Sequence, residues 1–106
     1  MFVMGTISQT EEPELFRHAK FQMQIQRWPE ARSILQQLTV AAPKDQSYRA
    51  LLAYVRGHEA AIAGDLERAR AEWQRALSID PKLEDAAQAL RTRARRKSFV
   101  DRLFGR

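Results

Sequence analysis

The side chains that could perform acid–base or metal chemistry in this chain are few and scattered. His18 and His58 lie forty residues apart with dissimilar neighbours, so each is expected to be a surface or groove polar group rather than a base or ligand. Glu11, Glu12 and Glu14 flank an expected helix start, where acidic side chains favour the helix dipole. Cysteine is absent, which excludes thiolate nucleophiles, thiolate metal sites and disulfides. We therefore expect no enzymatic activity, no cofactor and no metal.

The most distinctive charged feature is a basic run near the carboxyl end, followed by four apolar residues. On a helix, Phe99, Val100, Leu103 and Phe104 form two pairs four residues apart, which is typical of an amphipathic cationic helix. Such a segment could bind an anionic membrane surface, contact a nucleic-acid backbone or dock on another protein. A solvated capping helix or an unstructured tail also accounts for the charge. The basic residues are Arg91, Arg93, Arg95, Arg96, Lys97, Arg102 and Arg106.

The net charge of +5 over 106 residues comes entirely from that end of the chain. Residues 1–81 hold ten Lys and Arg and ten Asp and Glu, whereas residues 82–106 hold eight basic residues and three acidic ones. An apolar content of 44% with 29% charged residues is ordinary for one globular domain. The amino-terminal residues lack the basic region and long apolar core of a signal peptide or anchor, so a cytoplasmic location is expected.

A pattern of small, bulky and proline residues occurs twice in the chain, 38 residues apart. Small residues let two helix backbones approach closely, a bulky apolar residue fills the space beside them, and proline cannot continue a helix. The pattern therefore predicts two pairs of closely packed antiparallel helices. Ala19, Ala31, Leu35 and Pro43 correspond to Gly57, Ala69, Trp73 and Pro81, with spacings of twelve, four and eight residues.

Capping and turn residues divide the chain into about five helices, and no strand-like alternation is present. The fold class predicted is all-α, with stacked antiparallel helical hairpins. Gly64 is expected to supply a left-handed stop after the third helix. The expected starts are Thr10 with Pro13 in the opening turn, Trp28-Pro29, Asp45, Asp65, and Asp80 as a cap before Pro81. The expected buried stripes are Ala31, Ile34, Leu35 and Leu38 on the second helix and Leu66, Ala69, Trp73, Ala76 and Leu77 on the fourth.

The second of these units resembles the tetratricopeptide repeat. Its Gly57, Ala69, Trp73, Ala76 and Pro81 stand where that family places small, small, aromatic, small and proline residues. The resemblance implies an α-solenoid of two hairpins, about residues 11–43 and 45–81, after an amino-terminal lead over residues 1–10. A capping helix over residues 82–98 and a basic amphipathic tail over residues 99–106 would follow. The 38-residue period exceeds the family's period of about 34, which predicts one extra turn at the start of the third helix.

In this family the first helix of each repeat lines a concave surface that binds peptides or a partner's helix. The resemblance therefore implies a groove with apolar anchors and a cationic rim. Leu51, Val55 and Ile62 could instead be core residues or a homodimer seam, because helical spacing alone does not separate core from groove. Only Lys20 is basic among the positions that chaperone-binding members use to hold a carboxylate terminus, so that activity is disfavoured. The expected groove residues are Phe16, Arg17, Lys20, Met23, Leu51, Tyr54, Val55, His58 and Ile62, with Gln88 and Thr92 from the fifth helix.

These features predict a non-catalytic protein-interaction module that captures a segment of another protein or a peptide. Two repeats bury their apolar faces incompletely, so a homo-oligomer or origin as the tail of a larger protein is also expected. The alternative is a tether whose basic carboxyl-terminal helix binds an anionic membrane surface or nucleic acid.

Overall fold

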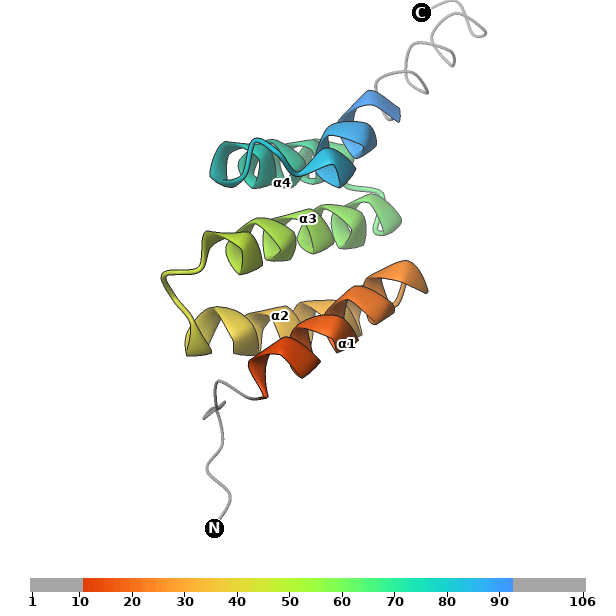
Figure 1. Cartoon of the computed structure of the whole chain (residues 1–106). Coiled ribbons are helices and arrows are strands. Elements are labelled where there is room, and N and C mark those ends of the chain that lie inside the picture. Colours follow the sequence, from red (N-terminus) through yellow and green to blue (C-terminus); the bar gives the residue numbers. More distant parts are fainter. Residues whose placement is uncertain (1–10, 93–106) are drawn as a thin grey trace, which may run out of the picture.

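The computed structural model describes residues 11–92, and the regular secondary structure of this part is all helix (Figure 1). Four complete helices are followed by a fifth that begins at residue 84 and continues to residue 92, the end of the described part. The predicted all-α class with five helices is therefore confirmed. The complete helices are α1 (Glu12–Gln24), α2 (Trp28–Ala41), α3 (Gln46–Ile62) and α4 (Leu66–Ile79).

Each short connection reverses the chain, so that consecutive helices lie antiparallel and side by side (Figure 1). α1 packs against α2, α2 against α3, and α3 against α4. The fifth helix adds to this stack through Ala86, which is buried against Ala53 of α3 and Ala76 of α4. The result is two helical hairpins, α1–α2 and α3–α4, with the fifth helix against the second hairpin.

Aspartate side chains begin both helices of the second hairpin, as predicted. Asp45 accepts a hydrogen bond from the Ser47 backbone N–H at 3.0 Å, and Asp65 accepts one from the Arg68 N–H at 3.1 Å. Each bond satisfies a donor that the helix itself leaves without a partner. The helices of the first hairpin start without a side-chain cap, and each has a proline in its first turn. Thr10, the predicted cap of α1, lies outside the described residues.

The predicted start of the fifth helix is wrong by three residues. Asp80 was expected to cap a helix beginning at Pro81, but its carboxylate accepts a hydrogen bond from the Lys82 N–H at 3.1 Å. That bond closes a tight turn around Pro81, because the acceptor and the donor are only two residues apart. The Leu83 N–H then donates to the Asp80 carbonyl, and the helix begins at residue 84.

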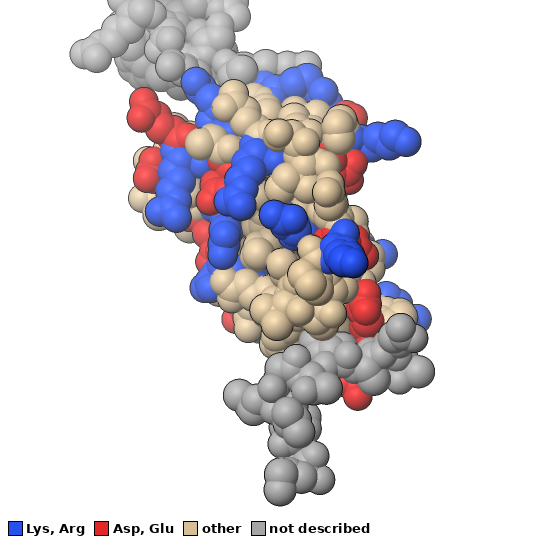
Figure 2. All heavy atoms as spheres, turned by 90° about the vertical axis from the view of Figure 1, so that its left-hand side faces the viewer, with Lys and Arg blue, Asp and Glu red and all other residues tan. Residues whose placement is uncertain are grey.

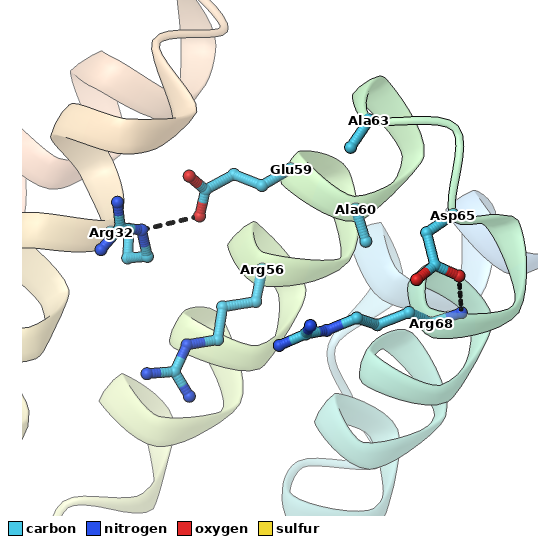
Figure 3. Close-up of a pocket in the computed structure, with 7 residues that line it drawn as sticks. All are labelled: Arg32, Arg56, Glu59, Ala60, Ala63, Asp65 and Arg68. Carbon is cyan, nitrogen blue, oxygen red and sulfur yellow. Dashed lines mark hydrogen bonds and ion pairs between the residues drawn. The ribbon is translucent and has the colours of Figure 1, made fainter.

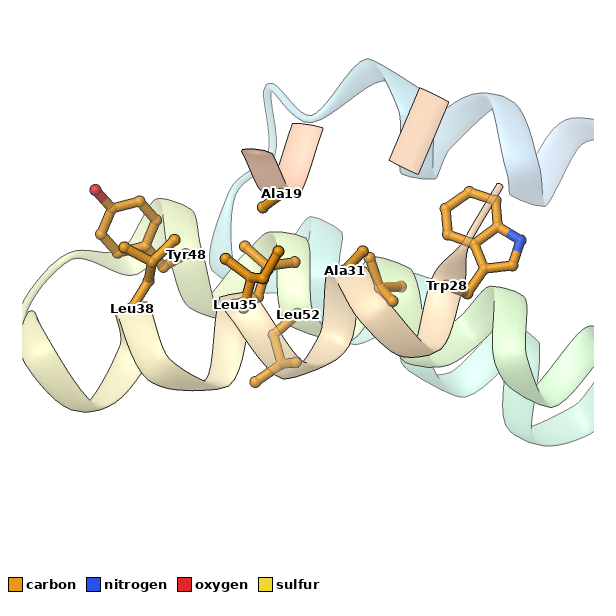
Figure 4. Close-up of a cluster of buried hydrophobic side chains, with 9 residues drawn as sticks. Ala19, Trp28, Ala31, Leu35, Leu38, Tyr48 and Leu52 are labelled. Carbon is orange, nitrogen blue, oxygen red and sulfur yellow. The ribbon is translucent and has the colours of Figure 1, made fainter. Parts of the chain in front are cut away.

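The buried side chains follow the predicted stripes with one exception. Ala31, Ile34, Leu35 and Leu38 of α2 are buried together with Trp28 (Figure 4). Ala69, Trp73 and Ala76 of α4 are buried and Leu77 is half-buried, but Leu66 is 52% exposed. The described part of the fifth helix packs on α4 through Ala86, Ala89 and Leu90, next to Ala69, Trp73 and Ala76. The first residue of α4 is therefore left uncovered.

The extra turn expected in the third helix is present. α3 has 17 residues and α1 has 13, and both helices end at equivalent positions, 38 residues apart. The four additional residues correspond to one helical turn at the start of α3. This turn carries Tyr48, which is buried against the first hairpin.

Several predictions from the sequence fall outside residues 11–92. They are the lead over residues 1–10, the end of the capping helix over residues 93–98, and the tail over residues 99–106. Every member of the basic run except Arg91 belongs to these segments. Within the described residues, no helix has the length and apolar character needed to cross a membrane.

Candidate partner-binding groove

A hollow of about 290 Å³ lies between α1, α3 and the fifth helix. Four of the nine predicted groove residues meet there: Lys20 and Met23 from α1, and Leu51 and Tyr54 from α3. These residues come from the first helix of each hairpin, as expected for a groove along one side of a helical repeat. We call this hollow the groove; its lining is Lys20, Met23, Gln24, Trp28, Leu51, Tyr54 and Asp85.

The floor of the groove rests on a cluster of four aromatic rings. Trp28 and Tyr54 both line the groove and meet edge to face, with centroids 6.1 Å apart. The His58 ring stacks on Trp28, with centroids 4.2 Å apart. It meets the rings of Tyr54 and Trp73 edge to face, with centroids 4.7 and 5.1 Å away. Such ring pairs hold one another in fixed orientations. His58 therefore lies within the aromatic packing that supports the groove, and does not line it.

A hydrogen bond within the second hairpin joins the backbone of Tyr54 to α4. The Tyr54 backbone carbonyl accepts this bond from the indole Nε1 of Trp73 at 3.1 Å. Burial, together with the nearby Asp85 carboxylate, raises the pKa of the Tyr54 hydroxyl to about 12. Both effects disfavour the phenolate. Tyr54 thus offers a half-buried aromatic face and a neutral hydroxyl at neutral pH.

Opposite charges stand on the two walls of the groove. Lys20 projects from α1, and its ammonium lies 4.7 Å from the centre of the Phe16 ring. Asp85 projects from the first turn of the fifth helix, on the other side of the apolar floor. Both residues are exposed. A bound segment would therefore meet a positive charge at one wall and a negative charge at the other.

Contacts between α1 and α3 fix the wall that carries Lys20. Phe16 packs edge to face on Tyr48, with centroids 5.3 Å apart, and the Tyr48 hydroxyl donates to Glu12 Oε1 at 2.6 Å. Burial and the hydrogen bond to the Glu12 carboxylate raise the pKa of Tyr48 to about 12. Phe16 is thus a support beneath Lys20.

The remaining predicted groove residues lie elsewhere. Val55 is fully buried in the core, so its prediction as a partner contact is wrong: it faces α2 from inside the stack. Ile62 is 73% exposed at the last position of α3, outside the groove lining. Arg17 is exposed and forms an ion pair with Glu14 at 3.8 Å. Gln88 and Thr92 are exposed on the fifth helix.

Sequence reasoning missed three groove residues: Gln24, Trp28 and Asp85. Asp85 lies three residues before Gln88 and seven before Thr92, so all three share one face of the fifth helix. With the fifth helix begun at residue 84, the helical spacing from Gln88 and Thr92 would therefore have indicated Asp85 as a groove residue. Trp28 was expected as the start of the second helix; it is buried, and it also lines the groove.

The scattered acid–base candidates stay apart in the structure. His18 accepts a hydrogen bond at its Nε2 from the Gln22 side-chain amide, 3.0 Å away, on the exposed side of α1. In residues 11–92, no three His, Asp or Glu side chains come together as metal ligands would. Comparison of the chain with protein-family models, curated proteins and solved structures finds no match.

Proposed function

We propose that this chain is a tetratricopeptide-like interaction module whose groove captures a segment of another protein, without catalysis. The observation that carries this proposal is the groove itself: an apolar, aromatic floor between two walls of opposite charge. Protein interfaces commonly combine a desolvated aromatic centre with a charged rim, and the rim charges select and orient the partner. The 38-residue repetition of the two hairpins supports the family assignment.

The groove also constrains the chemistry of its partner. A volume of about 290 Å³ accommodates a large apolar side chain and is too small for a whole helix. The best-matched segment places such a side chain between Met23, Leu51 and Tyr54. It carries an acidic residue toward Lys20 and a basic residue toward Asp85, which fixes its direction in the groove.

The test is peptide selection followed by charge reversal. Peptides selected from a random library displayed on phage are measured for affinity to the full chain and to Lys20→Glu and Asp85→Lys variants. Both residues are exposed, so the fold survives the substitutions. We expect each reversal to weaken binding about tenfold, and Lys44→Glu and Glu67→Lys, exposed charges outside the groove, to change it less than about twofold. Equal losses in all four variants would refute binding in the groove.

The alternative function, a basic tether, receives no support from the described residues. Its candidate segment lies mostly outside residues 11–92, and Arg91, the member of the basic run that is described, forms an ion pair with Glu84 at 2.7 Å. A cytoplasmic location and the homo-oligomer expected from the small number of repeats stay predictions.

A further inference from the structure

Five arginines from three helices surround two adjacent hollows on another side of the stack. The first hollow, about 300 Å³, lies between Arg32 of α2, Arg56 of α3 and Arg68 of α4 (Figure 3). The second, about 90 Å³, is lined by Arg49, Arg56 and Arg75. Arg56 belongs to both. We call these five residues the arginine face.

The arginine face and the groove lie on different sides of α3. Arg56 follows Leu51 by five residues, which corresponds to a rotation of about 140° around a helix. None of the residues that line the groove lines either arginine hollow. A ligand on the arginine face therefore leaves the groove open.

The acidic residues of this face leave most of its positive charge uncompensated. Glu59 forms an ion pair with Arg32, with Oε1 2.8 Å from Nε, and Asp65 accepts a hydrogen bond from the Arg68 backbone (Figure 3). In the described part of the chain, no carboxylate forms an ion pair with Arg49, Arg56, Arg68 or Arg75.

This concentration of arginine is a local feature of a body that is neutral in total. Residues 11–92 hold twelve Lys and Arg and twelve Asp and Glu. Figure 2, which views the stack from the side where α2 ends and α3 begins, shows many basic side chains, with fewer acidic side chains among them and uncharged surface beside them. The arginine face combines five arginines with two carboxylates, Glu59 and Asp65, so its own charge is positive although residues 11–92 are neutral in total.

Guanidinium groups bind carboxylates and phosphates through two parallel hydrogen bonds, so the arginine face is suited to an anionic ligand. The surface between the arginines is apolar, from Leu52, Ala53, Ala60 and Ala63. No aromatic side chain lines either hollow, so nucleic-acid bases have nothing to stack on. Glu59 and Asp65 interrupt the positive surface, so the arginines do not form a continuous track for a polyphosphate backbone. These features favour a peptide with separate carboxylates.

We propose that the arginine face binds an acidic segment of a second protein, rich in Asp and Glu, while the groove holds its own partner. Arg49 and Arg56 are separated by about 10 Å along α3, two turns of helix. A segment with several carboxylates along its length can therefore contact both Arg49 and Arg56. With both sites, this protein joins two partners. Binding at the arginine face does not require a ligand in the groove.

The probe is a fluorescent peptide of alternating Glu and Ala, with a Gln-and-Ala peptide as its uncharged control. Binding to the full chain is measured by anisotropy, at low and at high salt. We expect the Glu peptide alone to bind, and the binding to weaken as salt rises. Arg56→Gln should reduce the affinity about fivefold or more, and Arg68→Gln and Arg75→Gln, which report on the separate hollows, about threefold each.

Arg70→Gln is the matched control, because Arg70 is an exposed arginine of α4 that lines neither hollow. It removes the same charge and should change the affinity less than about twofold. Equal effects of Arg56→Gln and Arg70→Gln, or no binding of the Glu peptide, would overturn the proposal. Tighter, Arg56-dependent binding of a single-stranded oligothymidine would overturn it too, in favour of nucleic acid.

Discussion

The two hairpins share one backbone plan but fill it with different side chains. Positions 38 residues apart occupy the same places: Ala19 and Gly57 on the first helices, Leu35 and Trp73 on the second. All four are buried. In the second hairpin glycine replaces alanine, and tryptophan replaces leucine. Each hairpin therefore fills the space between its helices with a different pair of side-chain sizes.

The close fit in the second hairpin shows why this exchange is coupled. A Cβ atom on Gly57 would lie 2.3 Å from Nε1 of Trp73, far inside van der Waals contact. The same indole nitrogen donates to the Tyr54 carbonyl, which holds the ring in place. Leu35 has no such donor and its hairpin tolerates alanine at position 19. The lesson is that residue 57 is glycine because residue 73 is tryptophan.

The residues in the turn within each hairpin differ between the hairpins, but the backbone hydrogen bonds of these turns are the same. Gln26 and Gly64 both have positive φ, at 61° and 87°, and each N–H donates to the carbonyl three residues before it at 3.1 Å. The next residues, Arg27 and Asp65, have nearly the same backbone angles, but only Asp65 caps its helix. The first hairpin thus has the same turn with less favourable residues.

The largest effect should come from exchanging the packing pair of the second hairpin for that of the first. Trp73→Leu alone should reduce the free energy of unfolding by about 2–4 kcal/mol through the cavity it leaves, and Gly57→Ala alone by about 1–3 kcal/mol through the clash. In the Trp73→Leu background, Gly57→Ala should become neutral or stabilise by up to about 1 kcal/mol, because alanine favours helix. Urea unfolding, followed by circular dichroism, measures the stability of the wild type, the two single variants and the double variant.

The control for this cycle is Asp45→Ala, which removes a cap at the far end of α3. Its effect should add to that of Trp73→Leu within about 0.5 kcal/mol. Additive Gly57→Ala and Trp73→Leu effects would show that the two residues are not coupled, and the comparison of the hairpins would fail.

A smaller effect is expected from moving the helix cap between hairpins. Asp65→Ala should cost about 1 kcal/mol, since it leaves the Arg68 N–H without its acceptor. Arg27→Asp should add a cap to α2 and stabilise the protein by about 0.5–1 kcal/mol, because Arg27 already has the backbone angles of Asp65. Thermal unfolding of the two variants should shift the midpoint in opposite directions. A loss of stability in Arg27→Asp would contradict the equivalence.

The turn residues give a still smaller and reciprocal pair of changes. Gln26 has a left-handed backbone that glycine adopts without steric penalty. Gln26→Gly should therefore stabilise the protein by about 0.5 kcal/mol, after the greater chain entropy of unfolded glycine is subtracted, and Gly64→Gln should destabilise it by about as much. Urea midpoints measure both. Destabilisation by Gln26→Gly would show that the Gln26 side chain has a role of its own.

The stability contributed by Tyr48 and Tyr54 should fall at alkaline pH and be complete at neutral pH. Tyr48 and Tyr54 have pKa values raised from 10.0 to about 12, so the folded state keeps protons that the unfolded state loses. Their contribution is complete below pH 10 and is lost as the pH rises through about 12. In the Tyr48→Phe variant, the urea midpoint of unfolding should fall less steeply between pH 10 and about 12. An unchanged slope in the variant would show that Tyr48 does not titrate as described.

Much of the fold could be predicted because its signals are local. Asp45, Asp65 and Gly64 act within a few residues of themselves, so the sequence was sufficient to place both ends of α3 and the start of α4. Asp80-Pro81 is the exception, since an aspartate before proline begins either a helix or a tight turn and only the hydrogen bond to Lys82 distinguishes them. The buried stripe of α2 was predictable from helical spacing.

The sites depended on contacts between helices, which spacing alone does not determine. Leu66 and Trp28 hold equivalent positions, but Trp28 is covered by Tyr54 and His58 of the next helix, whereas Leu66 is exposed. Val55 and Tyr54 are neighbours on α3, yet only Tyr54 reaches the groove. The arginine face draws on three helices, so no single stretch of sequence indicates it.

The central claim is that the groove between α1, α3 and the fifth helix is the partner-binding site. The most direct measurement is a nuclear magnetic resonance titration of the isotope-labelled full chain with a peptide selected from the random library. We predict saturable chemical-shift changes concentrated at Lys20, Met23, Leu51, Tyr54 and Asp85, with little change at Arg56. Shifts confined to the arginine face or to residues 93–106, or no saturable shifts from any selected peptide, would contradict the account.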